Sequence, residues 1–94
     1  MSKQITTSDL YESAFYLVSG FEITAIKVVT EAGNLVCQFT HEGENIQSFQ
    51  LEYFNAKSTV NLLEFRRSYR RVHTLSLSNL REARKKLKTQ GGTL

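Results

Sequence analysis

The chain contains 94 residues, of which 40% are hydrophobic and 11% aromatic, and its formal net charge is +3. This length and composition fit one globular domain with a single core and exclude two domains. No apolar run is long enough to span a membrane, and the first residues lack the charged-then-apolar pattern of a secretory signal. The single cysteine, Cys37, cannot form an internal disulfide. We therefore expect one cytoplasmic domain at residues 1–88, followed by a disordered tail at 89–94.

The basic residues are concentrated near the C-terminus. Residues 1–65 contain three basic and eight acidic residues, a net charge of −5, whereas residues 66–94 contain nine basic residues and one acidic residue, a net charge of +8. Such an asymmetry bears on binding partners rather than on the fold. It favours a polyanion, or an acidic protein surface, as the partner.

Residues 9–19 are predicted to form the first helix. Its apolar residues recur at the helical period and are Leu10, Ala14, Leu17 and Val18. Asp9 is a favourable N-cap residue, and Glu12 stands at the capping-box spacing from it. Gly20 should end the helix, because glycine adopts the left-handed conformation at little steric cost.

Residues 21–30 and 35–41 are predicted to form an antiparallel hairpin around a turn at 31–34. The alternation of apolar residues in the first strand shifts by one position, which indicates a bulge near Ala25 or Ile26. The second strand should place three side chains against the first helix, because two strands alone are only marginally stable. These side chains are Leu35, Cys37 and Phe39.

The second half of the chain is predicted to be mainly helical, which makes the fold class α+β. Residues 46–54 read as a short helix, residues 62–73 as a longer helix capped by Asn61, and residues 76–88 as a helical tail. A third strand at 46–54 remains an alternative interpretation, as does a brief extended segment at 58–60. The expected core consists of Leu10, Ala14, Leu17, Phe21, Ile23, Leu35, Cys37, Phe39, Phe49, Phe65, Tyr69 and Val72.

Three stretches of the sequence share a pattern with known proteins. They are TTSDLYESAFYLVSGFEI, LVCQF and EYFNAKSTVNLLEFRRSYRRV. Together they resemble a family of short bacterial and phage proteins with a Thr-x-Asp-Leu-Tyr helix start, a Gly-Phe hairpin, a Tyr-Phe-Asn segment and a Val-x-x-x-x-Phe helix that ends in basic residues. The resemblance covers residues 6–75 and implies a compact α+β domain without an assigned activity or site. The basic extension after Leu75 lies outside it.

Four arginines on the longer predicted helix form the strongest candidate site. They are Arg66, Arg67, Arg70 and Arg71. Like charges at i,i+4 spacing repel by a few tenths of a kcal/mol, which a phosphate backbone would offset. Tyr69 and His73 lie near the edges of the arginine arc, where they could stack on unpaired bases. The candidate nucleic-acid surface continues into the tail with Arg81, Arg84, Lys85, Lys86 and Lys88.

Arginine also binds carboxylates in a bidentate manner, so a second interpretation stays open. The arginines would then pair with acidic residues of the same or a neighbouring subunit, or would form a solvated face. The acidic residues in question are Glu12, Glu22, Glu42, Glu44 and Glu52. Tyr11, Phe15 and Tyr16 lie outside the main apolar stripe of the first helix, which indicates either an interface in a homo-oligomer or a helix covered on two sides.

No catalytic site or metal site is predicted. His41 and His73 close a strand and a helix, and neither has a second ligand at metal-binding spacing. Cys37 is expected to be a small core residue rather than a nucleophile. We therefore expect a non-enzymatic protein without cofactor, small-molecule substrate or membrane association. The favoured function is a nucleic-acid-binding accessory protein, and the alternative is a homo-oligomeric protein-interaction module.

Overall fold

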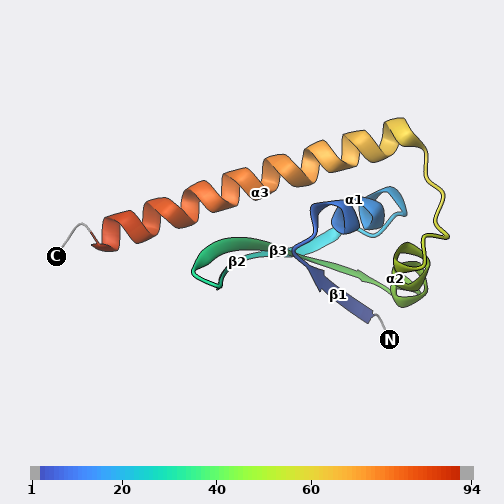
Figure 1. The fold of residues 1–94 in the computed structure, drawn as a ribbon, viewed down its shortest axis with the longest axis horizontal. Helices are drawn as coiled ribbons and strands as arrows, with labels where there is room; N and C mark the ends of the chain where they lie inside the picture. Colours follow the sequence, from blue (N-terminus) through green and yellow to red (C-terminus); the bar gives the residue numbers. More distant parts are fainter. Residues whose placement is uncertain (1–2, 92–94) are drawn as a thin grey trace.

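The computed structural model describes residues 3–91, which form an α+β fold (Figure 1). The elements in chain order are β1 (Lys3–Thr7), α1 (Leu10–Val18), β2 (Ile23–Glu31), β3 (Asn34–Gly43), α2 (Ile46–Phe54) and α3 (Leu62–Gly91). The three strands form one antiparallel sheet in the order β1-β3-β2. Figure 1 shows α3 running along one side of the molecule, with α1 between α3 and the sheet.

The predicted hairpin is confirmed, and the sheet contains one further strand. β2 and β3 are joined at Ala32 and Gly33, whose φ angles of 50° and 83° suit a type I′ turn. The register shifts between Ile23 and Ala25, so the bulge lies just before the predicted position. The third strand is β1, whereas the alternatives at 46–54 and 58–60 are wrong. β1 has one buried residue, Ile5, and a single apolar position produces no detectable periodicity.

The ends of α1 follow the predicted signals, except that the capping box is incomplete. The backbone N–H groups of Tyr11 and Glu12 donate to Asp9 Oδ1 at 2.9 and 3.3 Å. The Glu12 carboxylate does not bond back to the N-cap; it accepts hydrogen bonds from the Thr7 and Tyr16 hydroxyl groups. At the other end, Gly20 has a φ of 96°, as expected for a residue that stops a helix.

One continuous helix, α3, replaces the two helices predicted for residues 62–73 and 76–88. Asn61 caps its start, because its Oδ1 atom accepts from the Glu64 N–H at 3.0 Å. Ser76 is buried and Leu75 packs against the cluster of Cys37 and Phe39, so the segment expected to break the helix is held on the sheet. His73 therefore lies within α3 rather than at a helix end.

The sequence predicts a disordered tail at residues 89–94. Helix α3 extends through its first residues and ends at Gly91. Residues 92–94 lie outside the described residues. None of the helices in residues 3–91 combines the length and the apolar character needed to cross a membrane.

The core forms two neighbouring clusters, and all twelve predicted core residues are buried or half-buried. The first cluster consists of Ile5, Phe15, Tyr16, Phe21 and Ile46, and the second of Ala14, Cys37, Phe39 and Val72. The expectation that Phe15 and Tyr16 form an exposed interface is wrong, since they are only 4% and 0% exposed. Phe15 packs against Phe49 and Tyr53, so α1 is covered by α2 as well as by α3.

Candidate nucleic-acid interface

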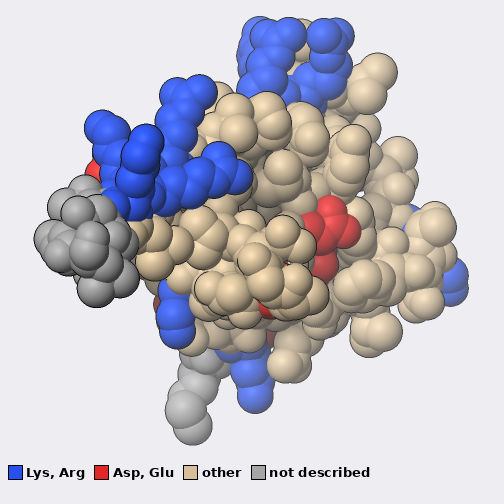
Figure 2. Space-filling model, turned by 60° about the vertical axis from the view of Figure 1, so that its left-hand side comes forward, with Lys and Arg blue, Asp and Glu red and all other residues tan. Residues whose placement is uncertain are grey.

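All nine basic residues predicted for the nucleic-acid surface lie on α3, and all are exposed. At 100° per residue, five of them fall within about 60° of one another on the helix surface. These five, which we name the basic stripe, are Arg66, Arg70, Arg81, Arg84 and Lys88. Their Cα atoms span about 33 Å along the helix axis, at 1.5 Å per residue. Figure 2 shows two large groups of lysine and arginine side chains at the top and upper left of this face, with other basic side chains standing apart from them.

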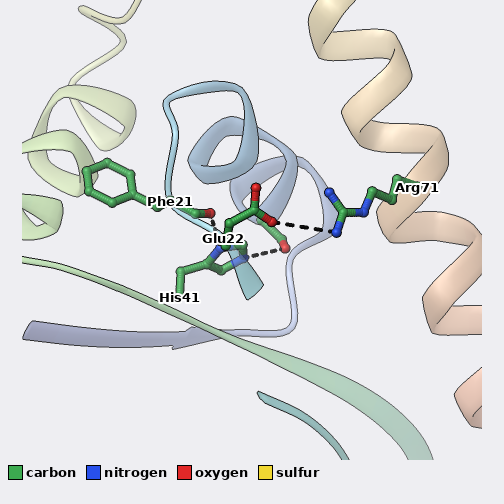
Figure 3. Close-up of polar contacts among 5 residues, drawn as sticks. Phe21, Glu22, His41 and Arg71 are labelled. Carbon is green, nitrogen blue, oxygen red and sulfur yellow. Dashed lines mark hydrogen bonds and ion pairs between the residues drawn. The ribbon is translucent and has the colours of Figure 1, made fainter. Parts of the chain in front are cut away.

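The remaining two helix arginines lie beside the stripe, and one of them forms an ion pair. Arg71 Nη2 lies 3.6 Å from Glu22 Oε2, and Figure 3 shows the guanidinium reaching from α3 towards the loop after α1. Both side chains are mostly exposed, so the pair contributes at most about 1 kcal/mol. Glu22 is one of the acidic residues considered from the sequence. Within residues 3–91, no residue of the basic stripe has a carboxylate partner at ion-pair distance.

A row of aromatic rings borders the basic stripe. Tyr11 of α1 stacks on Tyr69 of α3, with ring centroids 4.8 Å apart and planes inclined by 20°. Tyr69 in turn stacks with His73, at 5.9 Å and 13°. Tyr69 and His73 were expected near the arginines, whereas the approach of Tyr11 was not, because α1 and α3 are distant in sequence. Tyr11 remains 57% exposed and is the one residue of the predicted aromatic interface that faces solvent.

The two tyrosines and two arginines of the basic stripe meet in one surface groove. Its volume is about 400 Å³, and it is lined by Tyr11, Leu62, Phe65, Arg66, Tyr69 and Arg70. We name it the Tyr11 groove. Its lining is mainly apolar, with two guanidinium groups. Partial burial and the neighbouring Tyr11 hydroxyl raise the pKa of Tyr69.

A buried polar pair lies beneath α1, and the sequence did not predict it. Ser13 and His41 are both fully buried. Ser13 Oγ lies 2.7 Å from His41 Nε2, and His41 Nδ1 lies 2.9 Å from the Phe21 carbonyl oxygen (Figure 3). Since a carbonyl can only accept, Nδ1 carries the proton and Nε2 accepts from the Ser13 hydroxyl. The pair resembles a nucleophile and its general base, but both side chains are fully buried, and the hydrogen bond between them satisfies their polar groups inside the core.

One signal for this burial was present in the sequence. His41 continues the alternation of Leu35, Cys37 and Phe39, and in β3 it points to the same helix-covered face. Cys37 on that face is 4% exposed, as predicted, and burial raises the pKa of its thiol. Among residues 3–91, no three His, Cys, Asp or Glu side chains gather closely enough to hold a metal ion.

We expect the buried imidazole to make the stability of the protein depend on pH. Burial lowers the pKa of His41, although the Phe21 carbonyl and the Glu12 and Glu22 carboxylates oppose this effect. Below about pH 6.5 the unfolded state then binds more protons than the folded state. The free energy of unfolding should therefore fall as the pH drops from about 6.5, by up to about 1.4 kcal/mol per pH unit. Urea unfolding at pH 7.5 and 5.5 measures this difference.

The second histidine of the chain supplies the control for this measurement. His73 is exposed, so His73→Gln should keep the pH dependence, whereas His41→Gln should reduce it. An equal loss of stability at pH 5.5 in wild type and His41→Gln would contradict the assignment of the effect to the buried imidazole.

Comparison with protein-family models, curated proteins and solved structures finds no match for this chain. The family resemblance described from the sequence thus stays a prediction. The basic stripe and the Tyr11 groove are the surface features of this α+β fold that bear on its function.

Proposed function

We propose that this protein is a non-enzymatic accessory factor that binds nucleic acid through the basic stripe of α3, without strong sequence preference. The observation that supports this most directly is the alignment of five cations along one face of a continuous helix. In residues 3–91 these cations have no carboxylate partners. Their mutual repulsion at i,i+4 spacing is relieved when phosphates bind.

The length of the stripe also favours a polymer over a small anion. A single phosphate group can contact only one or two of the five side chains at a time. Along the axis of duplex DNA each strand carries one phosphate per about 3.4 Å, so a stripe of about 33 Å is long enough to contact several phosphates of one polymer. Contacts to phosphates position a protein without reading the base sequence, which is the reason for expecting weak sequence preference.

The salt dependence of binding tests this proposal. Five phosphate contacts predict a slope of about −4.5 for the logarithm of affinity against the logarithm of salt concentration on duplex DNA. The variant Arg81→Ala/Arg84→Ala should lower the magnitude of the slope by about 2, because both residues are exposed and contribute no core packing. Fluorescence anisotropy of labelled oligonucleotides at several salt concentrations measures the slope.

A matched variant separates the stripe from the net charge of the protein. Lys27→Ala/Lys57→Ala removes two exposed positive charges from β2 and from the loop after α2, and it should leave the slope unchanged. The proposal fails if micromolar protein binds neither single-stranded nor duplex oligonucleotide at about 50 mM salt, a concentration at which phosphate contacts are strong.

The second candidate function is a homo-oligomeric interaction module. Several large apolar side chains around the connection between α2 and α3 are exposed, which favours a protein partner at this end of the molecule. They are Leu51, Phe54, Val60, Leu62 and Leu63. If this candidate is correct, nucleic-acid binding will be negligible in the same titration, and sedimentation of the protein will show an oligomer.

A further inference from the structure

We propose that the Tyr11 groove holds an unpaired base of a single-stranded nucleic acid, so that the protein binds single strands in preference to duplex. This inference rests on the proposed function and adds the form of the nucleic acid to it. The basic stripe accounts for affinity to phosphates of any kind. The groove accounts for a choice between paired and unpaired bases.

The aromatic geometry of the groove provides the stacking surface. Tyr69 covers one face of the Tyr11 ring, yet Tyr11 is 57% exposed, so its other face is open to solvent. A base placed on that face would extend the row formed by Tyr11, Tyr69 and His73. Base stacking on exposed aromatic rings is how many proteins hold single strands without reading their sequence.

The charges around the groove match a nucleotide rather than an uncharged apolar ligand. Leu62 and Phe65 supply an apolar lining for a base, and Arg66 and Arg70 supply cations for its phosphates. The Asp9 carboxylate acts electrostatically on Tyr69 and is therefore the acidic group to consider beside the groove. Its carboxylate already accepts from two backbone N–H groups as the N-cap of α1, which reduces its repulsion of a phosphate.

The groove also adjoins the basic stripe. One nucleic-acid strand can therefore stack a base on Tyr11 and contact the cations with its phosphates. Arg66 and Arg70 line the groove and begin the stripe that ends at Lys88. A strand that runs along α3 therefore passes the open face of Tyr11. In a duplex the bases are paired and stacked on one another, so they cannot reach a ring of this kind. Single-stranded DNA and RNA share the required chemistry.

The absence of tryptophan from the chain permits a direct test. The variant Tyr11→Trp places a single indole in the groove, where a stacked base should quench its fluorescence. The probes are oligo(dT) and oligo(rU) of about 12 nucleotides and a mixed-sequence duplex of about 12 base pairs. This length lies within the usual range of single-strand site sizes. We expect quenching by one or both single strands and none by the duplex. The single strand that binds more strongly shows whether DNA or RNA is the preferred ligand.

Alanine substitution provides the second measurement. Tyr11→Ala should weaken binding of the single strand by about 5- to 150-fold, the range expected for the loss of one stacked base. Its affinity for duplex should change little, and Tyr11→Phe should retain single-strand binding because the ring remains. Phe54→Ala is the control, since Phe54 is exposed on α2 and does not line the groove.

The outcomes separate this inference from the function on which it rests. Equal affinity for duplex and single strands, with no quenching of the Tyr11→Trp variant and no effect of Tyr11→Ala, would overturn the stacking site and leave the basic stripe intact. Failure of every oligonucleotide to bind would overturn both. Quenching is read from a variant that keeps an aromatic ring, so the test remains decisive even if Tyr11→Ala lowers stability.

Discussion

Replacing Phe39 with alanine should lower the free energy of unfolding by about 3–5 kcal/mol. Phe39 is 0% exposed and lies on β3, the central strand, opposite Thr7 of β1 and Ile26 of β2. Its ring packs in the cluster that joins the sheet to α1 and α3. The substitution leaves a cavity at the contact of all three layers, which surrounding side chains can fill only in part. Urea unfolding followed by circular dichroism measures the loss.

The same substitution at an exposed ring is the control for this loss. Phe54 is 64% exposed on α2, so Phe54→Ala should cost less than about 0.5 kcal/mol. Native domains are stable by only about 5–15 kcal/mol, so the Phe39→Ala protein should lose a large share of its stability. Similar costs for the two substitutions would contradict the position of Phe39 in the core.

Replacing Ser78 with proline should lower the free energy of unfolding by about 3 kcal/mol. Ser78 is exposed in the middle of α3, so the change removes little packing and acts on the backbone. Proline lacks the N–H that bonds to the carbonyl of Thr74, and its ring clashes with that carbonyl. The helical signal in far-UV circular dichroism should fall as well. Ser78→Ala is the matched control and should retain both stability and helicity.

This substitution distinguishes one long helix from the two shorter helices that the sequence predicted. If a separate helix began at about residue 76, residue 78 would lie in its first turn, where proline is tolerated. A cost below about 1 kcal/mol would then be expected, and it would contradict a continuous α3. Continuity also matters for the proposed function, because it places Arg70 and Arg81 on one stripe.

Helix α3 connects the fold with the proposed function, because one of its faces packs against the domain and the other carries the basic stripe. Val72 and Ser76 are buried against the rest of the domain, and they fix the orientation of the helix. The basic stripe lies on the exposed side as a consequence. Changes that loosen the buried face are therefore expected to affect binding indirectly.

Much of the fold could be predicted from the sequence, because the relevant signals are local. Helix α2 has the predicted bounds of 46–54, and α1 begins and ends at its predicted cap and glycine. The hairpin turn follows from a short segment in which glycine permits a positive φ. These signals act between residues a few positions apart, so the same physical preferences are visible in the sequence and in the fold.

The errors share a different physical cause, namely contacts between distant segments. β1 is a strand because it pairs with β3, about 35 residues later, and its own sequence carries one buried residue. The segment around Ser76 contains serine and threonine, which favour helices only weakly. It is helical because Leu75 and Ser76 pack on the sheet. Such contacts depend on residues far away in the sequence, so the segment alone does not reveal them.

The candidate site also combines features that the sequence predicts with features that depend on tertiary contacts. The sequence alone determined that the cations cluster after residue 65 and lie away from the core face of a helix, because charge and helical period are properties of neighbouring residues. Which aromatic rings remain exposed depends instead on tertiary packing. Packing between α1, α2 and the sheet buries Phe15 and Tyr16, whereas the contact of α1 with α3 leaves Tyr11 open beside Arg66 and Arg70. Exposure depends on what covers a side chain, and here the covering elements come from distant parts of the chain.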